Sequence, residues 1–190
     1  MNRSAGWSDV GGGAEGRRAF TIMEVLVVIG LVAILASLAF PVLLARKETA
    51  RIDEARGQLR VIEAALAQYQ SRLRSLPPSA GQGDNAGAEN LLWYVRPFLQ
   101  PEWARRWSGD TDGDGRLELL DPWGNPWVYF NHADYVRGGA DYVIGRRRVS
   151  VKPAKSLDAF ANAATYQLWA CGQNETDEEG SEDDIGNLGK

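Results

Sequence analysis

The most restrictive feature of the sequence is an uninterrupted apolar run, Val25–Leu44, of 20 residues without a charged side chain. At about 1.5 Å per residue, a helix of this length spans about 30 Å, the thickness of a bilayer core. A core helix of a small domain rarely needs so long an uncharged run, and a secretory signal peptide has a shorter one before a small-residue cleavage site. The run therefore predicts a transmembrane helix. Arg17-Arg18 on its N-terminal side indicates a cytoplasmic N-terminus.

A helical pattern continues beyond the apolar run. From Arg46 to Leu73 apolar residues recur at steps of three and four, and charged residues fill the positions between them. This predicts one long helix whose second half packs its apolar stripe on a globular head. A coiled coil is the alternative, although Gly57 would weaken its seam. The stripe consists of Ile52, Ala55, Leu59, Ile62, Leu66, Tyr69 and Leu73.

The composition excludes several classes of protein. Lys and Arg number 21 against 25 Asp and Glu in 190 residues, so the chain lacks the basic excess of a nucleic-acid-binding protein. The single cysteine, Cys171, excludes an intramolecular disulfide and a cysteine-based zinc site. The single histidine, His132, belongs to no nucleophile motif of the GxSxG type. The sequence therefore offers no motif of a Ser-His-Asp hydrolase.

The region after the long helix has the composition of a small α+β head. Residues 75–90 are rich in Pro, Gly and Asn and predict a loop, and residues 88–99 predict a short helix. The basic segment 145–155 predicts a solvated hairpin or loop. Three segments predict strands of a small antiparallel sheet: Trp127–Asn131, Asp141–Ile144 and Thr165–Ala170. Three tryptophans are expected in packing positions: Trp93, Trp103 and Trp107.

An acidic segment in the head resembles the calcium loop of EF-hands and dockerins. Aspartates occupy positions 1, 3, 5 and 12 of such a loop, a backbone carbonyl occupies position 7, and Gly at position 6 permits the sharp turn. Alternatively, the segment is an Asp/Gly turn without metal, or its last aspartate belongs to the motif that follows, DPWGNPW. The candidate ligands are Asp110, Asp112, Asp114, the backbone of Arg116, and Asp121.

A second acidic segment ends the chain. Residues 174–190 contain seven acids and one Lys. Such a cluster repels itself unless a hard cation neutralises it, so we expect Ca²⁺ here, with a disordered acidic tail as the alternative.

The junction before the apolar run reads RRAFTIMEV, from Arg17 to Val25. This sequence resembles the class III signal of type IV pilins and pseudopilins. The resemblance implies cleavage by a prepilin peptidase between Ala19 and Phe20, and methylation of the new N-terminus at Phe20. It also implies a role in filament assembly for Glu24, which would neutralise the terminal amine of the adjacent subunit. The family prefers Gly before the cut, where this chain has Ala19.

Two motifs of the head resemble the major pseudopilins of type II secretion systems. One is the turn DPWGNP, which leads into an aromatic strand. The other runs from Cys171-Gly to Asp183-Asp184-Ile-Gly-Asn187 and resembles that family's calcium loop. Asn174 stands where the family usually has Asp, and Asp177 is the alternative ligand. The implied Ca²⁺ ligands are the backbone of Cys171 and the side chains of Asn174, Ser181, Asp183 and Asp184.

The resemblance implies a type IV pilin-like α+β fold in four segments. These are a leader (1–19), a transmembrane or filament-core half-helix (20–45), an amphipathic half-helix (46–74) and a periplasmic head (75–190). The protein would be a structural subunit of a pseudopilus and not an enzyme. It would be anchored by one span in the bacterial inner membrane and polymerised to push exoproteins across the outer membrane. Its partners would be further copies of itself, minor pseudopilins, the prepilin peptidase and the inner-membrane secretion platform. The alternatives are a type IV pilin or minor pilin for adhesion, motility or DNA uptake, and a single-span calcium-binding periplasmic protein.

Overall fold

The computed structural model describes residues 21–156, 159–177 and 183–188, except for the side chains of residues 38–39 and 41–45. The chain divides into two compact units, which we describe separately: unit 1, Met1–Leu44, and unit 2, Ala45–Lys190. The leader expected over residues 1–19 lies outside the described residues.

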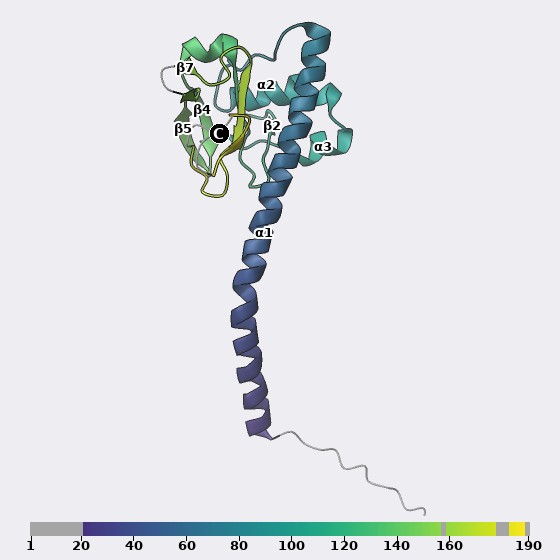
Figure 1. Ribbon diagram of the computed structural model, residues 1–190, viewed down its shortest axis with the longest axis vertical. Coiled ribbons are helices and arrows are strands. Elements are labelled where there is room, and N and C mark those ends of the chain that lie inside the picture. The colour runs from purple at the N-terminus through teal and green to yellow at the C-terminus, as the bar shows by residue number, and fades with distance from the viewer. Residues whose placement is uncertain (1–20, 157–158, 178–182, 189–190) are drawn as a thin grey trace, which may run out of the picture. The chain divides into compact units, whose positions relative to one another are not determined.

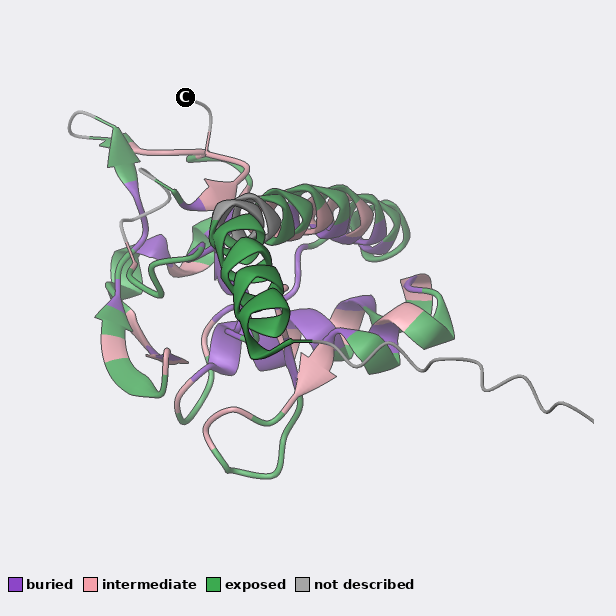
Figure 2. Cartoon of the chain, turned by 90° about the horizontal axis from the view of Figure 1, so that it is seen from below, coloured by how far each residue is buried: buried purple, intermediate pink, exposed green. Residues whose placement is uncertain are grey.

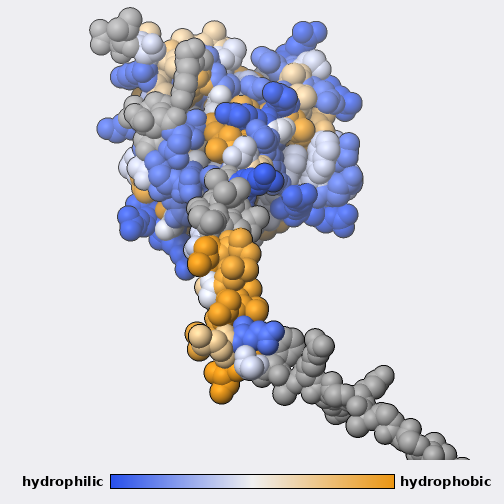
Figure 3. Space-filling model, turned by 60° about the horizontal axis from the view of Figure 1, so that its bottom comes forward, coloured by the Kyte–Doolittle hydropathy of each residue, from blue (hydrophilic) through white to orange (hydrophobic). Residues whose placement is uncertain are grey.

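Helix α1, Ile22–Leu73, is 52 residues long and belongs to both units. The prediction of one helix that continues past the apolar run is confirmed, and the helical backbone passes through Pro41 without interruption. In unit 1 the side chains from residue 21 to residue 37 are exposed (Figure 2), and the visible face of the helix is almost wholly hydrophobic (Figure 3). The sequence predicts a membrane-spanning segment over residues 20–45. Within the part of the chain that the structure describes, no helix is both long and apolar enough to cross a membrane.

In unit 2 the predicted stripe of α1 faces the interior. Ala55, Ile62 and Leu66 are completely buried, and Tyr69 is 6% exposed. Leu73 was expected in the stripe but is 57% exposed, because it ends the helix just before Arg74 turns the chain with a left-handed φ of 57°. A polar residue, Gln58, is also buried on this face.

Three short helical segments follow α1. They are α2 (Ala86–Val95), the 3-10 turn η1 (Arg96–Phe98) and α3 (Pro101–Arg106). The loop predicted over residues 75–90 therefore ends five residues early, at Asn85, and α3 was not expected. Trp107 is buried and Trp103 stacks on it at 5.4 Å between ring centroids, as a packing role requires. Trp93 is 73% exposed, so its predicted packing position is wrong: it lies on the face of α2 opposite the buried residues.

The strands form small antiparallel sheets rather than one sheet. The central sheet has the order β3-β8-β9, β4 and β5 form a hairpin, and two short pairs are β1-β2 and β6-β7. The three predicted strands are present as β3, β4 and β8. The basic segment 145–155 was predicted to be a hairpin or a loop, and it forms part of the β4–β5 hairpin. The bounds are β1 Ser108–Gly109, β2 Glu118–Leu119, β3 Val128–Asn131, β4 Ala140–Ile144, β5 Arg147–Val151, β6 Lys155–Ser156, β7 Ala159–Phe160, β8 Tyr166–Ala170 and β9 Ile185–Gly186, with a 3-10 segment η2 at His132–Arg137.

Two hydrophobic clusters hold unit 2 together. The first joins the stripe of α1 to α2, α3, β2, β3 and β8. The second joins α2 through Ala88 to β3, β4, β5 and β8. Figure 1 shows the corresponding arrangement: α2 and β2 lie next to the C-terminal half of α1, and β4 and β5 lie further from it. Helix α2 contributes residues to both clusters and therefore connects them.

Candidate functional site

The N-terminal end of α1 presents one carboxylate among exposed apolar side chains. Glu24 lies in the first turn of α1, where the helix dipole favours a negative charge. Thr21 caps this turn, since its hydroxyl oxygen accepts the N–H of Glu24 at 3.2 Å. Ile22 and Met23 beside it are 85% and 75% exposed. The expected cleavage residues, Ala19 and Phe20, lie outside the described residues.

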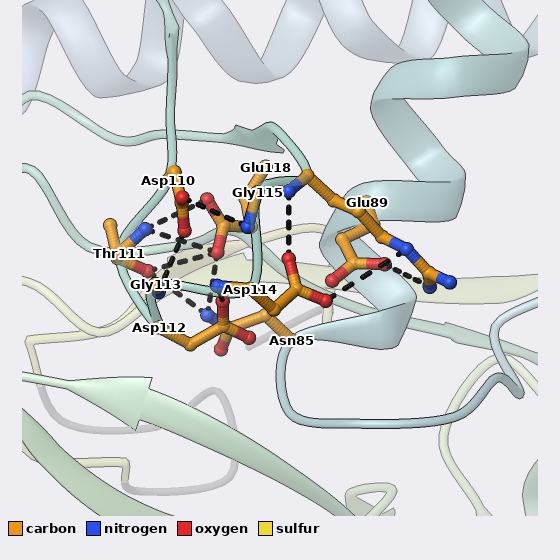
Figure 4. Close-up of polar contacts among 10 residues, drawn as sticks. Asn85, Glu89, Asp110, Thr111, Asp112, Gly113, Asp114, Gly115 and Glu118 are labelled. Carbon is orange, nitrogen blue, oxygen red and sulfur yellow. Dashed lines mark hydrogen bonds and ion pairs between the residues drawn. The ribbon is translucent and has the colours of Figure 1, made fainter.

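The acidic loop between β1 and β2, residues 110–118, is folded around its own aspartates (Figure 4). The carboxylate of Asp110 accepts the N–H groups of Gly113 at 2.7 Å and Gly115 at 3.0 Å. The carboxylates of Asp112 and Asp114 each accept the N–H two residues further on, at 3.1 Å and 2.7 Å. Gly113 and Gly115 have φ values of 81° and 89°, which side chains other than glycine rarely adopt. The alternating Asp/Gly sequence therefore forms the turn that its spacing suggested.

A buried glutamate fixes the loop to the head. Glu118 is completely buried, and its carboxylate accepts the N–H of Thr111 at 3.0 Å and the side-chain amide of Asn85 at 2.9 Å. Asn85 is itself completely buried just before α2, and its amide oxygen accepts the N–H of Val143 in β4 at 2.7 Å. The amide of Asn85 thus connects the acidic loop, the start of α2 and the β4–β5 hairpin.

Two groups of carboxylates in this region have the spacing of metal ligands. In one group Glu89, Asp112 and Asp114 each place one oxygen within 4.8 Å of the others. In the second group Asp110, Asp112 and Glu118 do the same, so that Asp112 belongs to both. Figure 4 shows Glu89 reaching the loop from α2. Glu89 and Glu118 were not among the predicted ligands.

The electrostatics of the loop reflect burial and like charge. Burial is the largest cause that raises the pKa of Glu89, of Asp112 and of Glu118 above ordinary values. Neighbouring aspartates raise the pKa of Asp112 further. Arg116 opposes this for Glu89, because its guanidinium donates to that carboxylate at 3.1 Å; it also lies 3.8 Å from the carboxylate of Asp114. The predicted backbone ligand, Arg116, thus contributes its side chain as the cation of the group.

Asp121 serves the next turn and is not grouped with the other aspartates. Its Oδ1 accepts the N–H groups of Trp123 and Asn125, each at 2.9 Å. Among the described residues, neither carboxylate group contains Asp121. Its contacts agree with the alternative prediction, in which Asp121 belongs to the motif DPWGNPW. The indole N–H of Trp123 donates to Glu48 of α1 at 3.0 Å, which attaches the turn to the helix.

The C-terminal acidic segment brings some of its predicted ligands together. The carboxylate of Asp183 accepts the N–H of Gln173 at 3.1 Å and the side-chain amide of Asn174 at 2.8 Å. Asp184 is 6% exposed, and Cys171 is completely buried at the end of β8. Ser181 lies outside the described residues.

The alternative ligand in this segment, Asp177, makes a different contact. Its carboxylate accepts the indole N–H of Trp169 at 3.0 Å, which holds the segment against β8.

Three residues of the acidic site were not predicted from the sequence, and they differ in how strong a signal the sequence contains for each. Glu118 stands at position 9 of the EF-hand-like numbering, where a ligand is common, so the loop pattern itself contains that signal. Glu89 lies more than twenty positions before the loop, and only its being the single acid of an otherwise apolar helical segment distinguished it. Asn85 carried no local signal.

The known proteins that the chain resembles share one name. It is similar to the type II secretion system core protein G of Pseudomonas aeruginosa, with 34% identity over 112 residues, which are 58% of this chain and 70% of that protein. The core protein G of Escherichia coli is 31% identical over 63% of this chain and 75% of its own length. That of Vibrio cholerae is 33% identical over 60% and 71%. No family model and no solved structure matches the chain.

Proposed function

Because the chain belongs to the family of type II secretion system core proteins G, we propose that its two units have different roles in a filament subunit. Unit 1 serves assembly, and unit 2 is the periplasmic part. The chain is a structural subunit of the pseudopilus of a type II secretion system. Similarity to these proteins over more than two thirds of their length carries this conclusion. The α+β fold, with its long N-terminal helix and small antiparallel sheets, agrees with it.

Unit 1 is the proposed assembly element. Its helix exposes Ile22, Met23, Leu26, Ile29 and other large apolar side chains. Contiguous apolar surface of this kind marks interaction with membrane or protein. We assign it first to the inner membrane and, after polymerisation, to the core of the pseudopilus, where the same segments of other copies cover it. Glu24 then pairs with the N-terminal amine of a neighbouring subunit.

Prepilin-peptidase processing is the proposed step that creates this amine. The peptidase would cut between Ala19 and Phe20 and methylate Phe20. The intact mass of the membrane-extracted protein from its host tests this. A mass of residues 20–190 plus one methyl group is expected, and the mass of the uncleaved chain in cells with an active peptidase would contradict it.

Unit 2 is the proposed periplasmic part of the subunit, and it has no catalytic role. It holds both hydrophobic clusters and is attached to α1 through the stripe at Ile62 and Leu66. Minor pseudopilins and the inner-membrane secretion platform are the proposed partners besides further copies of the chain. Growth of the filament would push exoproteins across the outer membrane.

We propose Ca²⁺ for the C-terminal segment of unit 2. Its donor set consists of oxygen atoms alone: the carboxylates of Asp183 and Asp184, the amide oxygen of Asn174 and the carbonyl of Cys171. Oxygen ligands of this kind suit a hard cation. The contacts between Asn174 and Asp183 already bring the two ends of the segment together. When bound, the cation would neutralise the acids of this segment and stabilise the fold of unit 2.

Deletion of the gene in its host, followed by complementation, tests the function. Without the chain, exoproteins of the type II system should accumulate in the periplasm, and the intact gene should restore their release into the medium. Unchanged release in the deletion strain would contradict the assignment. A periplasmic marker enzyme that stays inside the cells in all strains controls for leakage.

A further inference from the structure

We propose that the loop of residues 110–118, together with Glu89 of α2, is a Ca²⁺ site in unit 2 separate from the C-terminal segment. The site lies in the loop between β1 and β2, and its donors come from two elements of the fold. The proposal goes beyond the role of the chain in the pseudopilus, and that role does not depend on it.

The first observation is an excess of negative charge at short range. Five carboxylates form the two overlapping groups whose oxygens lie within 4.8 Å of one another. One cation, Arg116, contacts two of them. At full ionisation five negative charges against one positive charge leave a net charge of −4 (5 − 1). A divalent cation would halve that excess, because it places its charge where the carboxylates repel one another. The carboxylates are Glu89, Asp110, Asp112, Asp114 and Glu118.

The second observation concerns Glu89 and is independent of the loop. Its side chain is only 7% exposed. Arg116 donates to Oε2, whereas Oε1 is buried and has no hydrogen-bond partner among the residues that the structure describes. A buried carboxylate oxygen without a partner is costly, and it is uncommon unless water or an ion fills the place. Because the carboxylate of Glu89 lies against those of Asp112 and Asp114, a cation between the three supplies the missing partner.

The chemistry of the donors selects the type of cation. All five side chains offer carboxylate oxygens, with no imidazole nitrogen or thiolate among them. Such a set excludes a preference for zinc or copper and suits Ca²⁺ or Mg²⁺. Each backbone hydrogen bond of Asp112 and Asp114 uses Oδ1, so their Oδ2 atoms make no backbone bond in the loop. Five carboxylates offer more oxygen ligands than the one or two carboxylates by which Mg²⁺ is usually bound, which favours the higher coordination number of Ca²⁺.

The position of the site gives the cation a structural effect. Glu118 and Asn85 already connect the loop to the start of α2 and to β4. A cation shared by Glu89 and the loop would add a second connection between α2 and the loop. We therefore expect Ca²⁺ to raise the unfolding temperature of the protein, since a ligand that binds only the folded state stabilises it by mass action.

The test is calorimetric titration of the full chain, purified in detergent and freed of metal with EGTA, with Ca²⁺. Asp112→Asn removes the shared ligand, yet its amide oxygen can still accept the N–H of Asp114. Glu89→Gln removes the buried carboxylate and keeps its shape. Both variants should lose one Ca²⁺ equivalent, or bind it at least about tenfold more weakly, as changes near metal ligands do. Asp53→Asn is the matched control, because it removes an exposed aspartate of α1 far from the loop in sequence.

Two further measurements keep the proposal falsifiable. Without metal, the variants should unfold at temperatures no lower than that of the metal-free wild type, because each variant removes one charge from a repelling group, and this shows that they fold. The double variant Asp183→Asn, Asp184→Asn should retain the equivalent that Asp112→Asn loses. If Asp112→Asn and Glu89→Gln bind Ca²⁺ with the stoichiometry and affinity of the wild type, the loop is not a site and the proposal is overturned.

Discussion

Single polar side chains decide how the head is attached to α1. The indole N–H of Trp127 donates to Gln58 at 3.1 Å, and both side chains are buried. The indole of Trp123 donates to Glu48, which is the fourth residue of unit 2. The bond between Trp127 and Gln58 satisfies buried polar groups that would otherwise lack a partner, at a cost of about 1–3 kcal/mol. The orientation of unit 2 on its own part of α1 therefore depends on hydrogen bonds as well as on the apolar stripe.

Asp121 predicts a pH dependence of stability. Burial raises the pKa of its carboxyl from 3.8 to about 7. The folded state therefore holds the proton more tightly than the unfolded state. The contribution of the protonated Asp121 to the free energy of unfolding is fully present below about pH 3.8. It is lost as the pH rises toward 7, at about 1.4 kcal/mol per pH unit. Asp121→Asn keeps an oxygen for the N–H groups of Trp123 and Asn125 but cannot ionise.

Urea unfolding of residues 45–190 between pH 4 and pH 8 measures this effect. Relative to the wild type, Asp121→Asn should gain stability steadily from pH 4 to about pH 7. The exposed substitution Asp53→Asn should give a curve parallel to the wild type. Parallel curves for Asp121→Asn and the wild type would show that the carboxyl titrates normally in the folded protein.

Substitution of Glu24 should impair filament assembly without impairing folding. We expect Glu24→Gln to reduce the fraction of the chain in sedimentable filaments by about tenfold or more, because breaking an ion pair in an apolar environment costs about 3–5 kcal/mol. The unfolding of unit 2 should not change, since Glu24 belongs to unit 1. Glu102→Gln, at an exposed acid in the first turn of α3, is the control. Normal filament yield with Glu24→Gln would remove the residue from the assembly mechanism.

At the scale of elements, α2 is the part whose packing is most exacting. It contributes Leu91, Leu92 and Val95 to one cluster and Ala88 to the other. A Cβ on Gly87 would collide with the hydroxyl of Tyr142 and would lie 2.6 Å from the carbonyl oxygen of Tyr129. Those two tyrosines are joined by hydrogen bonds between β3 and β4. The helix can therefore approach the strands only because this position lacks a side chain.

Two Gly→Ala substitutions in helices should thus have opposite effects. A Cβ on Gly57 in α1 meets none of the described residues within 4 Å, so Gly57→Ala should stabilise the protein by about 0.5–1 kcal/mol through helix propensity. Gly87→Ala should destabilise it by about 1–3 kcal/mol through overpacking. Urea unfolding of both variants gives the comparison. A gain in stability for Gly87→Ala would mean that α2 is not packed as closely as described.

The long helix and the main strands could be predicted from the sequence because their signals are local. The stripe at Ala55, Ile62 and Leu66 has helical spacing, and β3 and β8 have strand composition. The division into several small sheets could not be predicted, because pairing between β3 and β8 joins residues far apart in the chain. The same holds for α3, a helix of six residues that begins at Pro101. Trp93 shows that composition does not say which side of a short helix is buried.

The acidic loop could be predicted only within its own segment. The aspartates at 110, 112 and 114 were identified from their spacing, and the structure groups them. Glu89 joins them only through the packing of α2, and Asp121 leaves them because the turn at Trp123 uses its carboxylate. Both outcomes depend on contacts between elements, which no local pattern contains.

At the scale of the whole molecule, the two units have opposite surfaces. Unit 1 exposes a continuous set of large apolar side chains (Figure 3), whereas unit 2 buries most of its large apolar residues in two clusters. Exposed apolar surface of this kind marks contact with a membrane or with other proteins, whereas unit 2 has an apolar interior of its own. The proposed transfer of the subunit from the inner membrane into the pseudopilus accounts for this difference.

Cross-linking of neighbouring copies through unit 1 in cells tests this account most directly. The native Cys171 is buried, so cysteines placed at Val27 and Ile29, two exposed positions on opposite sides of α1, are the reactive ones. With the complete secretion system present, a short bismaleimide should join the Val27→Cys, Ile29→Cys chain into a ladder of dimers, trimers and longer products. Addition of Glu24→Gln should shorten the ladder. A chain that stays monomeric, although both cysteines are labelled, would contradict assembly through this helix.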